Sequence, residues 1–212
     1  MKKMLRNLYQ SLGAAIMALC VMTTALAEEA PELLIESTVQ NLLDSFTAQK
    51  DELADDKQKL FQLVDDIALP LFDFQRISKL VLAKNWKKAN DTQRDEFGEE
   101  FKKLLIGTYA TALFQYTGNE KMVFKSTKIT EKKGRKFATV ESEVTLSSGP
   151  GIPVNYSMML SKEGDWKIYN MNIAGLNMVT SYRKTYAAAI SSQGIDGLIQ
   201  SMKETNARNY GA

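Results

Sequence analysis

The first half of the chain carries apolar residues at helical spacing. They recur every three or four positions between residues 32 and 46, and a second stripe over residues 60–68 ends before Pro70. A third, shorter stripe covers residues 77–86, and the longest covers about residues 92–117. The pattern therefore predicts a helical first half that extends to about residue 118.

The longest of these stripes carries signals at both ends. Thr92 and Asp95 have the spacing of a capping box, and Gly118 suits the position that follows a helix. Between them, large apolar residues hold a single face. Such a face normally packs in a core.

After Gly118 the apolar period changes from helical spacing to two. Residues 121–130, 136–146, 152–161 and 165–173 are rich in β-branched and aromatic residues, and Gly-containing turn signals separate them. Strands joined by short turns form an antiparallel meander, and helical spacing returns after residue 176. We therefore predict an α+β fold in which helices cover one face of a twisted antiparallel sheet of four or more strands.

The first 27 residues have the pattern of a cleavable export signal. Lys2, Lys3 and Arg6 precede an apolar run, and Ala25-Leu26-Ala27 matches a cleavage site. We expect the mature chain to span residues 28–212, with a helical part to about 118, a sheet over about 120–174 and helices over about 176–206. Acylation at Cys20 is the alternative, but Leu19 is large for the residue before such a site.

Cleavage changes the charge and removes one residue type. The first 27 residues hold three of the 27 basic residues and none of the 25 acidic ones, so the mature chain has a net charge of −1. It contains neither Cys nor His, which excludes disulfides, thiol nucleophiles, His-based triads, and thiolate or imidazole metal sites. We expect a periplasmic protein without a metal, a cofactor or a nucleic-acid partner.

Charge is unevenly distributed along the mature chain. Residues 28–66 have a net charge of −8, whereas residues 67–212 have a net charge of +7. Much of the positive excess lies in one predicted hairpin. Lys132, Lys133, Arg135 and Lys136 at its turn are candidates for docking an acidic partner, although a solvated turn has the same composition.

Catalytic options are few. Asp55-Asp56, Asp65-Asp66 and Glu99-Glu100 are adjacent carboxylates, which point in different directions on a helix. An enzyme with an apolar pocket, using Asp73 with Tyr109 or Tyr156, stays open as an alternative, as does an adaptor that binds another protein. We predict no catalytic residue.

Several ordered motifs resemble the MlaC (toluene-tolerance) family. They are residues 70–77, then Leu80-Val81-Leu82, Trp86 and Gln93-Arg94, and later residues 164–171, Gly175, Tyr182-Arg183, Gly194-Ile195 and Gly197-Leu198. Together they span about residues 30–205. The resemblance implies an NTF2-like fold and a periplasmic phospholipid carrier, expected as a monomer, that moves lipid between an outer-membrane Mla lipoprotein complex and an inner-membrane Mla ABC transporter complex.

A carrier of this kind needs an apolar cavity between sheet and helices. Strand positions rich in Met, Tyr and Trp suit such a cavity, and two acyl chains need the upper part of the usual range of about 300–1,000 Å³. The residues we expect to enclose it are Val81, Leu82, Trp86, Leu105, Tyr109, Leu113, Val154, Tyr156, Met158, Trp166 and Ile168. Asn170 and Ala174 stand where the family usually has acidic residues.

Overall fold

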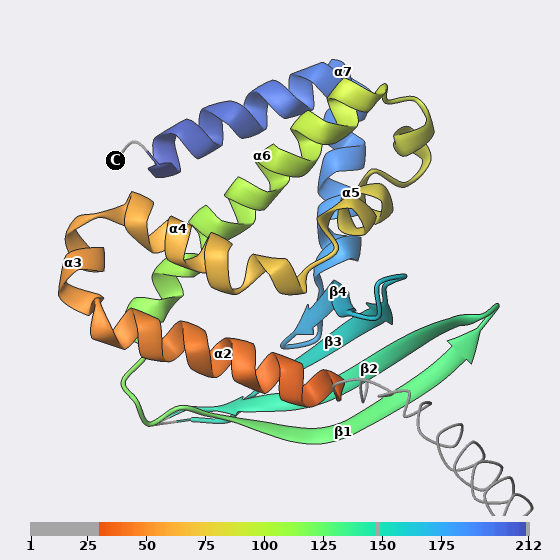
Figure 1. The fold of residues 1–212 in the computed structure, drawn as a ribbon. Helices are drawn as coiled ribbons and strands as arrows, with labels where there is room; N and C mark the ends of the chain where they lie inside the picture. Colours follow the sequence, from red (N-terminus) through yellow and green to blue (C-terminus); the bar gives the residue numbers. More distant parts are fainter. Residues whose placement is uncertain (1–29, 147–148, 211–212) are drawn as a thin grey trace, which may run out of the picture.

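A computed structural model describes residues 30–146 and 149–210, which form an α+β fold (Figure 1). The predicted export signal and the cleavage site lie outside the described residues. The helices before the sheet are α2 (Pro31–Ala48), α3 (Lys50–Asp55), α4 (Lys57–Ile67), α5 (Phe74–Leu82) and α6 (Asp91–Tyr109), with 3₁₀ segments η1 (Leu69–Leu71), η2 (Ala83–Lys87) and η3 (Ala110–Gln115).

The sheet is the predicted antiparallel meander with one more short strand. Its order is β1 (Lys121–Lys132), β2 (Arg135–Thr145), β3 (Ile152–Leu160), β4 (Trp166–Ile173) and β5 (Leu176–Asn177), and α7 (Met178–Tyr210) follows. Lys133 and Gly134 join β1 to β2 with φ angles of 54° and 68°, as a two-residue hairpin turn requires. The α+β prediction is thus confirmed.

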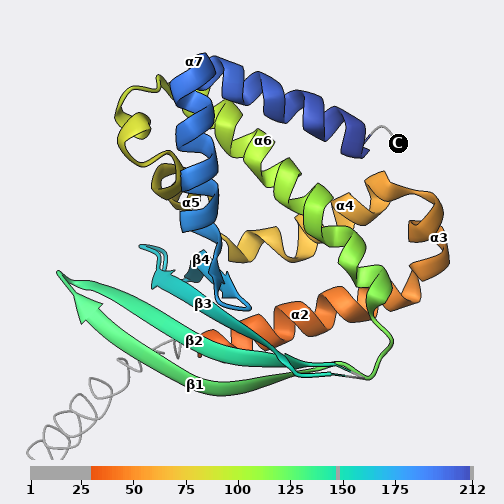
Figure 2. The same cartoon turned by 180° about the vertical axis from the view of Figure 1, so that it is seen from behind.

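Helix α2 lies along one face of β1 and β2, whereas α5 and the start of α7 contact the sheet at β4 (Figures 1 and 2). Ile35 of α2 belongs to the same buried cluster as Val140, Val154, Tyr156 and Met158 of β2 and β3; we call it the sheet cluster. A helix cluster joins α5, α6 and α7 around Phe97, Phe101 and Tyr186. A third cluster joins α2, α3 and α4 to the end of α6.

The start and end of α6 differ from the prediction. Asn90 is the N-cap: its side chain accepts a hydrogen bond from Gln93 N at 2.8 Å, and Asn90 N donates to the Gln93 side chain at 3.1 Å. The predicted cap at Thr92 is therefore wrong by two residues, because Asn90 and Gln93 make the reciprocal bonds that were expected of Thr92 and Asp95. The α-helix ends at Tyr109 and continues as the tighter η3, which keeps apolar side chains facing inward.

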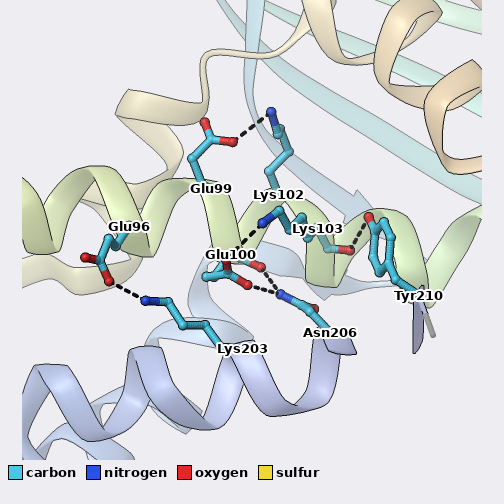
Figure 3. A network of polar contacts seen from close by, with 8 residues as sticks. All are labelled: Glu96, Glu99, Glu100, Lys102, Lys103, Lys203, Asn206 and Tyr210. Carbon is cyan, nitrogen blue, oxygen red and sulfur yellow. Dashed lines mark hydrogen bonds and ion pairs between the residues drawn. The ribbon is translucent and has the colours of Figure 1, made fainter. Parts of the chain in front are cut away.

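Helix α7 is divided at Gly194, whose φ of 75° and ψ of 177° are not helical. The half after Gly194 runs beside α6 and makes polar contacts with it (Figure 3). Lys203 pairs with Glu96 at 2.6 Å, and Asn206 donates to the Glu100 carboxylate at 2.7 Å. Glu99 points elsewhere, toward Lys102, so these adjacent carboxylates do not share a site, as predicted.

Candidate functional site

An apolar cavity of about 310 Å³ lies where the three buried clusters meet. Val81 and Phe101 bring the helix cluster to its wall, Ile168 brings the sheet cluster, and Ile106 brings the third. Its lining comes from α2, α4, α5, α6, η1, η3, β4 and α7. Apart from Asn170 and three tyrosines, every lining side chain is apolar, so the space suits a hydrocarbon ligand.

Helix α5 supplies one wall because its apolar residues share a face. Phe74, Ile77 and Val81 follow helical spacing, and all three line the cavity. The start of the helix is fixed to the sheet: Asp73 N donates to Ile168 O at 2.9 Å, while the Asp73 side chain accepts from Arg76 N at 2.8 Å. The cap and the strand together set the position of this wall.

Tyr109 marks the most accessible part of the lining. It is the one lining residue that is exposed, with 46 % of its surface accessible. Its hydroxyl lies 3.7 Å from Met178 Sδ, so the pair joins α6 to the start of α7. Burial, with a further contribution from Tyr109, raises the pKa of Tyr182, and this side chain stays neutral at physiological pH.

Asn170 has a structural partner in the wall. Its Oδ1 accepts a hydrogen bond from Val179 N at 3.2 Å and so satisfies one of the free N–H groups at the start of α7. A carboxylate in this position could accept the same bond. Ala174 lies in the exposed turn between β4 and β5 with a φ of 51°, and its backbone N–H donates to Pro153 O at 2.9 Å.

Five of the predicted pocket residues line this cavity, and six do not. Those that line it are Val81, Leu105, Tyr109, Leu113 and Ile168. Leu82 is buried in the helix cluster. The ring of Trp86 lies under the guanidinium of Arg94, whose central carbon is 5.0 Å from the ring centre. The other four, Val154, Tyr156, Met158 and Trp166, are buried in the sheet cluster.

The expectation that Val154, Tyr156 and Met158 enclose the cavity is therefore corrected: these inward side chains of β3 pack under α2 instead. The pairing of β3 with β4 shifts register between Ser157 and Met158, and Tyr169 is the extra residue on β4. A bulge of this kind redirects the side chains of the longer strand. It places Tyr169, Asn170 and Met171 in succession along the cavity wall, which strict alternation cannot indicate.

The volume also differs from the expectation. About 310 Å³ is at the lower end of the range for ligand pockets, not the upper end. The side chains around it pack closely, but Met171 and Met178 are among them, and methionine changes rotamer easily. Phe72, Phe74, Phe101 and Tyr182 were not predicted, although the helical spacing of Phe74 with Ile77 and Val81 was a usable signal.

A second concave region, the basic groove, has a volume of about 630 Å³. It lies among α5, the β1–β2 hairpin, the end of β3 and the segment that follows it. Its charged lining residues are Asp73, Arg76, Lys79, Glu131, Arg135, Lys136 and Lys162. Of the four docking candidates, Arg135 and Lys136 line it, whereas Lys132 and Lys133 are exposed but do not.

One segment separates the cavity from the basic groove. Phe72, Phe74 and Ile77 face the cavity, while Asp73 and Arg76 line the groove. The two spaces therefore share a wall that is a single layer of chain thick.

The geometry does not assemble the enzyme alternative. Asp73 is a helix cap in the basic groove, Tyr109 is at the cavity surface, and Tyr156 is in the sheet cluster with its hydroxyl 3.9 Å from Met122 Sδ. Burial raises the pKa of Tyr156 to about 12. Among the described residues there is no group of three His, Cys, Asp or Glu that could hold a metal ion. In the same part of the chain, no helix is both long and apolar enough to cross a membrane.

Residues that carry the family resemblance hold the helices together. Arg94 Nε and Nη2 donate to Trp86 O at 3.1 and 3.0 Å, and Arg183 Nε donates to Leu80 O at 2.8 Å. These bonds fix η2 to α6 and α5 to α7. Other motif residues, among them Phe72, Ile168 and Tyr182, line the cavity itself, so the motifs both form its lining and hold its walls in place.

Comparisons with known proteins agree on one family. The chain is 27% identical over 203 residues to the intermembrane phospholipid transport system binding protein MlaC of Haemophilus influenzae, covering 95% of this chain and 94% of that protein. It is 28% identical over 171 residues to the toluene tolerance protein ttg2D of Pseudomonas putida, covering 80% and 77%.

A solved structure gives the same result for the fold. The phospholipid-binding protein of Ralstonia solanacearum, determined in complex with a phospholipid, superposes with a TM-score of 0.73 at 30% identity, covering 84% of this chain and 97% of that one. The family model described as MlaC protein matches residues 36–204. The chain therefore belongs to the MlaC family.

Proposed function

We propose that the protein is a periplasmic carrier that holds the acyl chains of a phospholipid in the apolar cavity. The cavity itself is the observation that carries the proposal, because its lining offers almost nothing but hydrocarbon surface. The names of the relatives, which include a phospholipid transport protein and a phospholipid-binding protein, support the same function.

The energetics of acyl chains in water explain why a carrier is needed. Exposing each CH₂ group to water costs about 0.8 kcal/mol, so two long chains cost on the order of 20 kcal/mol. A cavity that shields them removes most of this barrier. The phosphate must stay in contact with water or with polar partners, because burying it without them is prohibitive. The surface near Tyr109, the exposed part of the lining, is where we place the headgroup.

The cavity must widen to hold two full acyl chains. Met171 and Met178 can change rotamer, and the contact between Tyr109 and Met178 is a weak one that an entering chain can replace. Opening at this contact would separate the end of α6 from the start of α7.

The proposed carrier function also includes a compartment and partner complexes. We place the mature chain, from Glu28 onward, in the periplasm, where it would exchange phospholipid with the outer-membrane and inner-membrane Mla complexes. The basic hairpin residues Lys132, Lys133, Arg135 and Lys136 are the proposed steering surface for these partners. A carrier of this kind does no covalent chemistry and needs no catalytic group.

Native mass spectrometry of the exported protein tests the proposal directly. We expect an intact mass that corresponds to a chain starting at Glu28, and additional mass that organic extraction identifies as phospholipid. A denatured sample gives the mass of the chain without cargo and serves as the control. Protein that carries no lipid after purification without detergent, and that takes none up from vesicles, would contradict the carrier function.

A further inference from the structure

The basic groove has more positive charge than its own carboxylates can neutralise. Five cations and two carboxylates line it. Within the described part of the chain, Arg76, Lys79, Arg135 and Lys162 form no ion pair. The groove therefore presents an uncompensated positive field inside a concave surface, which concentrates the attraction for an anionic ligand.

Arg76 is held in place at the inner wall of this groove. Its guanidinium lies 4.9 Å from the centre of the Tyr169 ring and 5.8 Å from that of Phe137. The two rings are nearly perpendicular, at 84°, and cation–π attraction to both holds the guanidinium in the corner between them. Its Nε atom is buried and has no hydrogen-bond partner among the described residues. A buried donor without an acceptor is costly, so an entering oxygen atom would be bound favourably.

We infer that the basic groove is a docking site for an acidic segment of a partner protein, with Arg76 as the carboxylate anchor. The inference rests on the proposed carrier function, because a carrier must be recognised by the proteins that load and empty it. The cations come from α5, from the β1–β2 hairpin and from the segment after β3, so one small anion cannot contact them all. A ligand that carries several charges along an extended chain can.

The shape of the groove favours a peptide over a membrane surface. A flat bilayer cannot follow a concave surface whose cations lie on three separate segments, whereas an extended peptide can. Trp86, Met159 and Leu160 also line the groove and give apolar contacts to the side chains that alternate with the acidic ones. In this arrangement, Arg76 binds one carboxylate through two parallel hydrogen bonds, and Lys79 and Lys162 attract its neighbours.

The test measures binding of a short fluorescein-labelled peptide of alternating Glu and Leu to the lipid-loaded protein by anisotropy. A matching peptide with Gln in place of Glu is the ligand control. We expect the Glu peptide to bind and the Gln peptide not to bind. Arg76→Gln should raise the dissociation constant about tenfold or more, the loss expected for a charge-assisted pair. Lys184→Gln, which removes an exposed cation far along the sequence on α7, should leave it unchanged.

A double variant tests the rim independently of the stacked arginine. Lys79 and Lys162 are exposed, so Lys79→Gln with Lys162→Gln should fold normally. We expect it to weaken peptide binding about threefold at low salt and less at high salt. If Arg76→Gln does not fold, this double variant decides the question, and unchanged binding would overturn the inference.

Competition separates a peptide site from a phosphate site. If inorganic phosphate, or vesicles of phosphatidylglycerol and phosphatidylcholine, bind in an Arg76-dependent manner while the Glu peptide does not, the groove is a phosphate site and the inference is overturned. Bound lipid is measured on the same samples. Arg76→Gln that loses the peptide but keeps its lipid supports the inference; peptide binding by a protein that never holds lipid contradicts the carrier function alone.

Discussion

Leu105 and Val154 show how single positions distinguish the cavity from ordinary core. Leu105 is half-buried on α6 and lines the cavity, whereas Val154 is 7% exposed and packs under α2. Leu105→Trp should fill space that acyl chains need and should lower the bound phospholipid substantially. Val154→Trp should keep its lipid but lose about 1–3 kcal/mol of stability through overpacking. Lipid extraction paired with thermal melts measures both effects.

The opposite result for these two variants would place the lipid-binding site elsewhere in the fold. If Val154→Trp were empty while Leu105→Trp kept a full lipid load, acyl chains would lie between β3 and α2 instead of between β4 and α6. If both variants lost lipid only in proportion to the fraction of unfolded protein, Leu105 would not line the lipid-binding cavity.

Sequence reasoning reached the cavity from the helices but not from the sheet. Leu105 and Val81 were predictable because helical spacing fixes which residues share a face. Val154 was assigned to the cavity because β3 alternates cleanly, and alternation does not say which helix covers the face. Tyr169 could not be predicted, because the extra residue in β4 arises only from the pairing with β3.

At the scale of elements, Gly194 makes two packing directions available to α7. Its φ of 75° with ψ near 180° is a conformation that only glycine adopts readily. Gly194→Ala should therefore lower stability by about 1–3 kcal/mol, although a Cβ atom there would meet no neighbour within 4 Å. The expected loss is conformational strain and not a clash, and a lower midpoint in thermal or urea unfolding measures it.

Gly98 provides the matched control for this substitution. It lies inside α6, and a Cβ atom there would meet Ser78 Oγ at 3.5 Å, an ordinary contact distance. Gly98→Ala should be neutral or stabilising by up to about 1 kcal/mol, because alanine favours the helix. Equal unfolding midpoints for the two alanine variants would mean that α7 can straighten at Gly194.

The elements themselves were more predictable than their ends. Hydrophobic period placed four strands and every helix except the six-residue α3, which buries only Leu53. The cap at Asn90 and the break at Gly194 depend on bonds and dihedral angles at one residue, and several nearby residues satisfy the same sequence pattern. The two-residue β5 is too short to show any period.

At the scale of the whole molecule, the charge asymmetry predicts salt-dependent transfer. Reversing Lys132, Lys133, Arg135 and Lys136 to Glu should slow lipid transfer to partner membranes or complexes at low salt, because steering acts on the association rate. The difference from the parent should shrink as salt rises above about 0.15 M, where the screening length is about 8 Å. Bound lipid should not change.

Transfer measured across a range of salt concentrations decides this point. Reversal of Lys57, Lys84, Lys184 and Arg208, which are exposed and lie elsewhere in the sequence, controls for net charge. If both variants slowed transfer equally, the effect would come from net charge. If the hairpin variant transferred lipid at the parental rate, the hairpin would be a solvated turn without a role in docking.

The thin wall between cavity and groove has a thermodynamic consequence. Residues 72–77 contact both spaces, so a ligand that displaces them from the groove side alters the free energy of whatever fills the cavity. Such coupling is reciprocal: a partner that weakens the hold on lipid by some factor is itself held more weakly, by the same factor, when lipid is present. A partner that docks in this way would favour the carrier without lipid. A carrier that still holds lipid would dissociate more readily from a partner that cannot accept the lipid.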